Sequence, residues 1–130
     1  MILLDTHVVI WLSSDDPRLS TAAKDAIDQA RQDGRGMAVS DFTLFELTLA
    51  FRKKRLGLEI SLESFLFEIE QRFAVLPITK HICVQTLSFP PEYPKDPADR
   101  IIGATAVVHG FPLVTADQAI RKSRAVPTIW

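Results

Sequence analysis

The fold follows from the first seven residues of the chain, Met1-Ile2-Leu3-Leu4-Asp5-Thr6-His7. Ile2, Leu3 and Leu4 form an unbroken apolar run, which is typical of a strand buried on both faces in the centre of a parallel sheet. Asp5 follows at once and would lie at the carboxyl edge of that sheet. In open α/β folds, ligands bind at this edge, where the order of the strands reverses. We therefore expect Asp5 to belong to a functional site and other acidic residues to reach the same edge.

Strands and helices are expected to alternate along the rest of the chain. Further strands are predicted at residues 37–39, 73–78, 111–115 and 126–130. Helices are predicted at about 6–12, 20–32, 42–55, 61–72, 79–87 and 96–110, with a last short helix after Asp117. With 130 residues the chain is long enough for one compact domain and too short for two ordinary ones. The pattern predicts a single α/β domain over residues 1–130 with a mostly parallel sheet.

The amino-acid composition indicates where the protein is located more than which reaction it performs. The apolar fraction is 47% and the formal net charge is −1, which is typical of a globular chain and neither indicates nor excludes nucleic-acid binding. Cys83 is the only cysteine, which fits a reducing compartment, and we interpret it as a small core residue. No signal peptide and no apolar run of about 20 residues is evident. We therefore expect a cytoplasmic protein that does not enter a membrane.

Three further stretches place acidic residues where they can join Asp5. Asp117 follows the predicted strand 111–115, Asp99 lies in the first turn of the predicted helix after Asp96, and Glu46 lies within a strongly apolar helix. Each acid also has an ordinary structural interpretation. An aspartate after a strand often only caps the next helix, which applies most to Asp96, and Glu46 can lie on a solvated stripe of its helix. Asp5 and Asp117 favour a site when taken together, because both follow strands that end at one edge.

The residue types point to a hard metal ion. The four acids Asp5, Glu46, Asp99 and Asp117 come without a cysteine pair or a histidine cluster, so their oxygens would select Mg²⁺ or Mn²⁺ over Zn²⁺. One or two such ions suit the hydrolysis of phosphodiester bonds. One ion would activate a water molecule, and a second ion about 4 Å away would stabilise the leaving oxygen.

Other polar residues near these acids have less specific interpretations. The hydroxyl groups of Thr6 and Thr115 could orient the carboxylates or simply cap helices. Basic residues could contact a polyphosphate or form a solvated helix face; these are Arg100, Arg121, Lys122 and Arg124. The cluster 52–55 is interpreted as a favourable helix end that could also serve as an RNA-binding track. No catalytic role is assigned to His7.

Four stretches in register resemble the PIN-domain ribonucleases, and among them the toxins of the VapC type. They are Leu3-Leu4-Asp5-Thr6-His7, Ser40-Asp41-Phe42-Thr43-Leu44-Phe45-Glu46-Leu47, Asp96-Pro97-Ala98-Asp99-Arg100-Ile101-Ile102-Gly103-Ala104-Thr105-Ala106 and Leu113-Val114-Thr115-Ala116-Asp117. Their order and spacing cover nearly the whole chain.

The resemblance implies a fold, an activity and partners. It implies a three-layer α/β/α domain with five parallel strands, and Mg²⁺- or Mn²⁺-dependent RNA cleavage by acids that match Asp5, Glu46, Asp99 and Asp117. Asp96 matches a frequent but less essential acid, and Thr115 a small hydroxyl residue near the site. Members of this type are usually homodimers that pair with a cognate antitoxin, and the apolar helix around residues 42–51 suits both contacts. The family often has alanine where Gly103 stands, and we expect only a small packing difference.

Two other functions stay open from the residues alone. One is a binding or dimerisation module on the same scaffold that has no turnover, although the complete set of acids speaks against it. The other is a phosphoacceptor or phosphatase domain with Asp5 as the nucleophile. Such domains call for a second aspartate near the first or a lysine after a late strand, whereas this chain has His7 and no lysine near Thr115.

Overall fold

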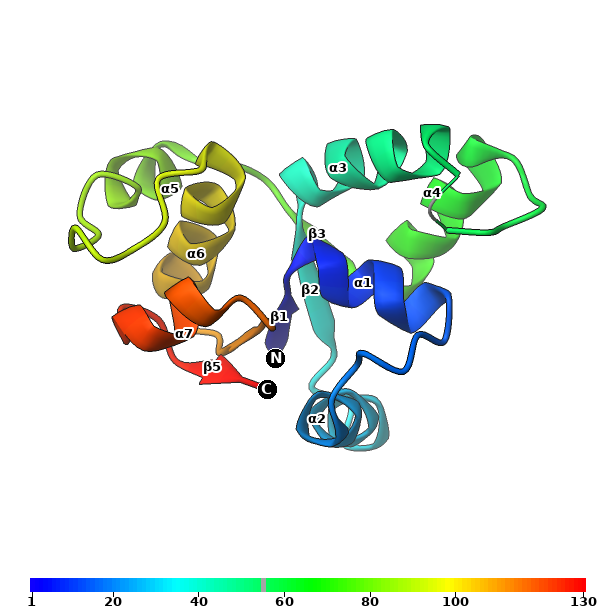
Figure 1. The fold of residues 1–130 in the computed structure, drawn as a ribbon, viewed down its shortest axis with the longest axis horizontal. Coiled ribbons are helices and arrows are strands. Elements are labelled where there is room, and N and C mark those ends of the chain that lie inside the picture. The colour runs from blue at the N-terminus through cyan, green and yellow to red at the C-terminus, as the bar shows by residue number, and fades with distance from the viewer. Residues whose placement is uncertain (55) are drawn as a thin grey trace.

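The computed structural model describes residues 1–54 and 56–130 and arranges them in three layers around a parallel sheet (Figure 1). The strands lie in the order β3-β2-β1-β4-β5, and each neighbouring pair is parallel. Their bounds are β1 (Ile2–Leu4), β2 (Met37–Ser40), β3 (Ala74–Leu76), β4 (Leu113–Val114) and β5 (Thr128–Ile129). The predicted α/β/α fold with a central five-stranded sheet is confirmed.

Three of the strands are shorter than predicted, and prolines bound each of them. Pro77 ends β3, whereas Pro112 and Pro127 directly precede β4 and β5. A proline has no N–H group, so it can join a sheet ladder only through its carbonyl oxygen. Pro112 and Pro127 do so, because their carbonyl oxygens accept hydrogen bonds from the amides of Leu3 and Leu113.

The strand order reverses between β1 and β4. The chain builds outward from β1 to β2 and β3, and then returns to place β4 on the other side of β1. In this pairing Leu4 lies opposite Val114, so Asp5 and Thr115 follow at the same carboxyl edge. This edge lies towards the top of Figure 1, where α3 and α6 begin.

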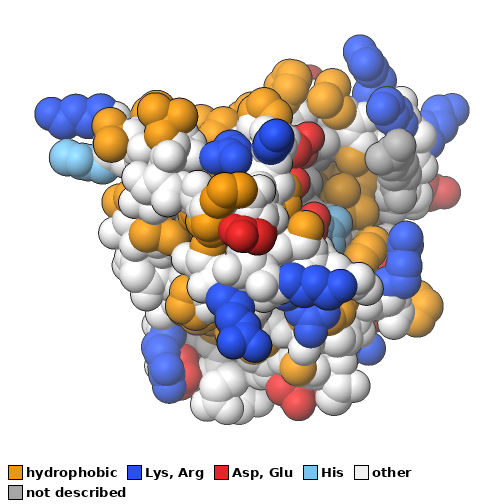
Figure 2. Space-filling view, turned by 60° about the vertical axis from the view of Figure 1, so that its left-hand side comes forward, with side chains coloured by type: hydrophobic (Ala, Val, Ile, Leu, Met, Phe, Trp, Pro, Cys, Tyr) orange, Lys and Arg blue, Asp and Glu red, His pale blue; other side chains and the backbone are white. Residues whose placement is uncertain are grey.

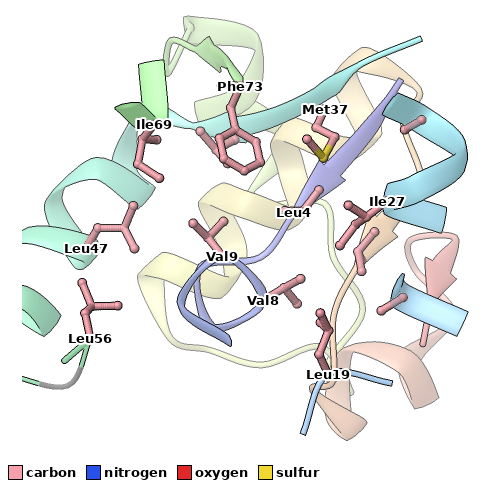
Figure 3. Close-up of a cluster of buried hydrophobic side chains, with 14 of the residues drawn as sticks. Leu4, Val8, Val9, Leu19, Ile27, Met37, Leu47, Leu56, Ile69 and Phe73 are labelled. Carbon is pink, nitrogen blue, oxygen red and sulfur yellow. The ribbon is translucent and has the colours of Figure 1, made fainter. Parts of the chain in front are cut away.

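Seven described helices cover the two faces of the sheet (Figure 1). On one face lie α1 (Thr6–Ser13), α2 (Thr21–Gln32), α3 (Asp41–Arg52) and α4 (Leu62–Arg72). On the other lie α6 (Pro97–His109) and α7 (Gln118–Ser123), and α5 (Lys80–Gln85) packs against α6. Each face has its own apolar cluster. Figure 3 shows the first, in which Leu4 meets residues of α1 to α4. Leu3 belongs to the other cluster, which confirms that β1 is buried on both faces.

Hydroxyl caps set most of the helix starts. Ser20, Ser61 and Thr79 accept hydrogen bonds from the amides three residues later, and Ser40 caps α3. Helix α3 ends at Arg52, before the predicted end at about residue 55, and Arg55 lies outside the described residues.

Helix α5 also ends earlier than predicted, at Gln85. The prediction that Cys83 is a core residue is wrong, because Cys83 is exposed. The next residue back, Ile82, is the buried one, and consecutive helical residues point about 100° apart. None of the described helices has the length and apolar character needed to cross a membrane.

Candidate functional site

Three acids from three different elements line one cavity of about 300 Å³. Asp5 follows β1, Glu46 lies in α3, and Asp99 lies in the first turn of α6. The remaining lining comes from Thr6, His7, Ile10, Leu49, Ala50 and Lys53. Figure 2 shows acidic side chains in a hollow of this face with basic side chains around its rim. The structure thus brings Asp5, Glu46 and Asp99 together at the edge where β1 and β4 end.

Asp5 is held by the chain on both of its oxygens. The residue is almost fully buried, at 4% exposure, and Oδ1 accepts a hydrogen bond from the Thr6 amide at 2.8 Å. Oδ2 accepts one from the Thr115 hydroxyl at 2.7 Å, across the switch point between β1 and β4. Asp5 therefore caps α1 and faces the cavity at the same time. Each oxygen still has acceptor capacity, because a carboxylate oxygen carries two lone pairs.

Glu46 is fixed by Thr6 in the same network. The Thr6 hydroxyl donates a hydrogen bond of 2.6 Å to Glu46 Oε1 and lies 3.0 Å from the hydroxyl of Thr43. Burial raises the pKa of Glu46, the hydrogen bond from Thr6 opposes that rise, and the charges of Asp5 and Asp96 add to it. The side chain is half-buried, so Glu46 is neither a solvated surface residue nor an isolated core acid.

Asp99 carries the largest electrostatic cost in the cavity. Burial, followed by repulsion from Asp5 and Asp117, raises its pKa from 3.8 to about 7, with smaller contributions from Asp96 and Glu46. Within the described chain, no group donates a hydrogen bond to its carboxylate. A divalent cation beside Asp99 would offset this repulsion directly.

Asp117 and Asp96 both act as helix caps. Asp117 Oδ1 accepts a hydrogen bond from the Ile120 amide at the start of α7, and its own amide donates to the Thr115 hydroxyl. Asp117 is not among the residues that line the cavity, but its charge contributes to the raised pKa of Asp99. Asp96 is exposed, and its Oδ1 accepts from the amides of Ala98 and Asp99. The capping interpretation of Asp96 is therefore confirmed.

The basic residues considered for RNA contact lie outside the cavity wall. Arg100 donates a hydrogen bond of 2.8 Å to the Thr86 carbonyl and lines a different hollow between α5 and α6. Arg121, Lys122 and Arg124 line an open hollow over α7. Lys53, just past the end of α3, lines the acidic cavity itself.

His7 was predicted to lie near the site without a catalytic role, and Lys53 was predicted only as part of the basic cluster 52–55; both residues line the cavity. A signal for Lys53 was present, since Glu46, Leu49, Ala50 and Lys53 follow the i, i+3, i+4, i+7 spacing of one helix face. No comparable pattern marks His7. Its contacts depend on the turn after β4, more than 100 residues away in sequence.

The expectation for Gly103 is wrong. A methyl group on Gly103 would overlap the hydroxyl of Tyr93 and crowd the ring of Phe89. Tyr93 is buried, stacks on Phe89 with ring centroids 3.9 Å apart, and donates a hydrogen bond of 2.6 Å to the Asp99 carbonyl. The glycine thus lets a tyrosine pack against the helix turn that carries Asp99.

No preformed metal cage is present in the part of the chain that the structure describes. Among residues 1–54 and 56–130, no group of three or more His, Cys, Asp or Glu side chains is arranged so that it could hold a metal ion. The donor set itself consists of carboxylates, which is the chemistry that Mg²⁺ and Mn²⁺ prefer.

These features define a class: a parallel α/β domain with a carboxylate-lined cavity at its topological switch point. The family model described as PIN domain matches residues 2–125. The chain therefore belongs to the PIN-domain family. It is 37% identical to Ribonuclease VapC22 of Mycobacterium tuberculosis, over 99% of this chain and 98% of that protein. The resemblance found in the sequence is confirmed.

Solved structures with the same fold come from toxin–antitoxin complexes. The chain is similar to VapBC2 from Rickettsia felis bound to a promoter DNA fragment, with a TM-score of 0.73, 16% identity and coverage of 98% of this chain and 97% of that one. It is also similar to DNA-bound VapBC from Salmonella typhimurium, with a TM-score of 0.69, 20% identity and coverage of 98% and 97%. These two likenesses are evidence for the fold.

Proposed function

We propose that this protein is a metal-dependent endoribonuclease and the toxin of a toxin–antitoxin pair, with residues 1–130 forming one nuclease domain. One observation carries the proposal: Asp5, Glu46 and Asp99 share a cavity in which burial, followed by repulsion from the neighbouring acids, raises the pKa of Asp99 to about 7. Three carboxylates share this cavity with one lysine, Lys53, among the described lining residues, so the site keeps an excess of negative charge that suits a divalent ion. The similarity to a ribonuclease over 99% of the chain supports RNA as the substrate.

The proposed ligands are Asp5, Glu46, Asp99 and Asp117, with Mg²⁺ or Mn²⁺ as one or two ions. When bound, the metal would supply an activated water for attack on the phosphodiester and stabilise the developing charge. Because the described side chains do not form a closed cage, the proposal includes a rearrangement of these carboxylates on binding. The Asp99 side chain, which accepts no hydrogen bond among the described residues, has the most freedom to turn.

The surrounding residues would orient the acids and the substrate. Thr6 holds Glu46, and Thr115 holds Asp5, so two hydroxyl groups fix the directions of two proposed ligands. Lys53 would place one positive charge on the wall where an RNA phosphate enters. Arg121 and Lys122 would meet the RNA farther along its backbone.

We also propose a cognate antitoxin as the protein partner, a homodimer as the working assembly and the cytoplasm as the location. Two relatives of the same fold were solved as VapBC complexes, which supports the antitoxin. On this chain, Phe45 of α3 is 56% exposed and contacts Phe42, so the helix offers apolar surface beside the cavity. A partner that covers this surface would also restrict access to Asp5 and Glu46.

The test is cleavage of structured RNA by the purified chain in Mg²⁺ or Mn²⁺, compared with EDTA. Asp5→Asn keeps the size of the side chain and removes its charge, and we expect it to lower the cleavage rate at least about 100-fold. Circular dichroism checks that the variant is folded. Cleavage that survives in EDTA, or in Asp5→Asn at the wild-type rate, would contradict the proposal.

A further inference from the structure

The ring of His7 joins two separate parts of the acidic site. His7 lies in the first turn of α1 and lines the cavity. Its Nε2 accepts a hydrogen bond of 3.0 Å from the amide of Ala116, in the turn between β4 and α7. Its Nδ1 lies 3.5 Å from Asp5 Oδ2. Because the Ala116 amide uses the lone pair of Nε2, the ring carries its hydrogen on Nδ1, the side that faces the carboxylate.

The turn that contacts His7 also contains Asp117. Ala116 directly precedes Asp117, whose amide donates to the Thr115 hydroxyl. The same hydroxyl donates to Asp5 Oδ2. Asp5 and the Ala116–Asp117 turn are therefore connected twice, once through Thr115 and once through the imidazole ring. The second connection places a side chain of α1 between the Asp5 carboxylate and the Ala116 amide.

Aromatic neighbours keep the ring in this orientation. The centroids of His7 and Trp11 are 5.0 Å apart, and those of His7 and Trp130 are 6.4 Å apart. Trp11 and Trp130 also contact each other, at 5.7 Å, and the guanidinium of Arg18 lies 4.8 Å from the centre of the Trp11 ring. The His7 side chain is only 31% exposed. An imidazole packed in this way keeps its two nitrogens aimed at fixed partners.

We propose that His7 is a positioning residue, which fixes the Ala116–Asp117 turn relative to Asp5 and so sets the separation of two carboxylates in the metal site. The inference rests on the proposed function for its catalytic consequence, but the contact itself can be tested without activity. A purely structural histidine would add packing energy between α1 and the tryptophans and would leave the metal site unaffected.

Three substitutions at His7 distinguish the roles of the two ring nitrogens. Glutamine places an amide oxygen near the position of Nε2 and can still accept from Ala116. Asparagine reaches only the position of Nδ1, and leucine keeps the apolar volume but offers neither group. The control is His109→Leu, because His109 is exposed at the end of α6. Each variant is measured for Mn²⁺ affinity by calorimetry, for kcat and KM on RNA, and for Tm.

We expect His7→Leu and His7→Asn to weaken Mn²⁺ binding about 10–100-fold and to lower kcat about 10-fold, with KM for RNA within about twofold of the wild type. His7→Gln should recover most of both losses, and His109→Leu should match the wild type. The inference is overturned if all three His7 variants lose affinity in proportion to Tm, or if none of them changes Mn²⁺ affinity.

Amide hydrogen exchange at Ala116 tests the contact independently of the proposed function. The amide should be protected in the wild type and in His7→Gln, and should exchange at least about tenfold faster in His7→Leu. A wild type that neither binds Mn²⁺ nor cleaves RNA defeats the proposed function, whereas this exchange pattern would still support the positioning contact. Equal protection of Ala116 in His7→Leu overturns the inference whatever the activity.

Discussion

On the strand side of the cavity, at the ends of β1 and β4, Asp5 is almost fully buried and both of its oxygens accept hydrogen bonds. On the helix side, in the first turn of α6, Asp99 is half-buried and its carboxylate accepts none from the described residues. The pKa of Asp99 is raised to about 7 by burial and by the neighbouring acids. The comparison indicates that the strand side is preorganised, whereas the helix side carries a repulsion that a bound cation would relieve.

After Asp5→Asn, the largest effect on the strand side is expected from Thr115→Val. Valine has nearly the shape of threonine, but it cannot donate to Asp5 or accept from the Asp117 amide. We expect the rate of RNA cleavage to fall about 10–100-fold, as it does when groups that orient metal ligands are removed. Steady-state kinetics with Mn²⁺ would measure the loss, and urea unfolding should show a loss of about 1–2 kcal/mol.

Thr105→Val is the matched control for that substitution. Thr105 is equally buried, but its hydroxyl donates to the Ile101 carbonyl within α6 and contacts none of the acids. It should lose stability without losing activity. If both variants lost activity in proportion to their stability, Thr115 would be a packing residue and the strand side would not be preorganised by its hydroxyl.

Gly103→Ala tests the packing of Tyr93 against α6, the helix that carries Asp99. Helix propensity alone predicts that alanine stabilises α6 by about 1 kcal/mol. The methyl group would instead overlap Tyr93, so we expect a loss of about 1–3 kcal/mol in the free energy of unfolding. Adding Tyr93→Phe removes the hydroxyl that is overlapped, and the double variant should lose less than the sum of the two single losses. A stabilising Gly103→Ala would show that the Tyr93 contact is not tight.

The repulsion at Asp99 predicts how stability depends on pH. The folded protein holds a proton on Asp99 more tightly than the unfolded chain, because its pKa rises from 3.8 to about 7. Stability is therefore lost as the pH rises through this range, and the loss is complete above pH 7. Asp99→Asn removes that loss. Since water screens a half-buried group, we expect the metal-free variant to be about 1–2 kcal/mol more stable than the wild type at pH 8 and equal to it near pH 4.

Urea unfolding in EDTA at pH 4, 6 and 8 would measure this difference. Asp25→Asn on the exposed face of α2 changes the same charge far from the cavity and should show no such trend. With Mg²⁺ at pH 8 the order should reverse, because the wild type gains binding energy that Asp99→Asn has lost. An Asp99→Asn variant as unstable at pH 8 as the wild type would show that the acids do not repel one another in the metal-free protein.

The fold was largely predictable because its determinants are local in sequence. The apolar run 2–4 defines the central strand, and the hydroxyl caps Ser20, Ser61 and Thr79 begin helices within one residue of the predicted starts. The strand lengths were overestimated because apolar residues around Pro112 and Pro127 look like strand, although proline cannot donate to a ladder. The hydrophobic pattern of the sequence identified each helix and strand, and the missing N–H groups of the prolines decided where β4 and β5 begin.

The site was predictable only in part, because some of its residues act over long distances in sequence. Asp5, Glu46 and Asp99, three of the four predicted acids, line one cavity, whereas Asp117 caps α7 and is not among the lining residues. The overlap at Gly103 depends on how the loop before α6 folds back to place Tyr93, and His7 depends on the turn at Ala116. Nothing in a local pattern reports either contact.

Lys53 offers the mildest test of the comparison, because it supplies the one lysine or arginine among the cavity-lining residues of the described chain. If its role is to attract a phosphate towards the acids, Lys53→Ala should raise KM for RNA about 3–10-fold with kcat unchanged, and should lower the salt dependence of binding by about one phosphate contact. Lys24→Ala, on the exposed face of α2, removes the same charge away from the cavity and should change neither value. A fall in kcat with KM unchanged would instead mean that Lys53 acts on the reacting phosphate. The end of α3 would then take part in the reaction together with the strand side and the helix side.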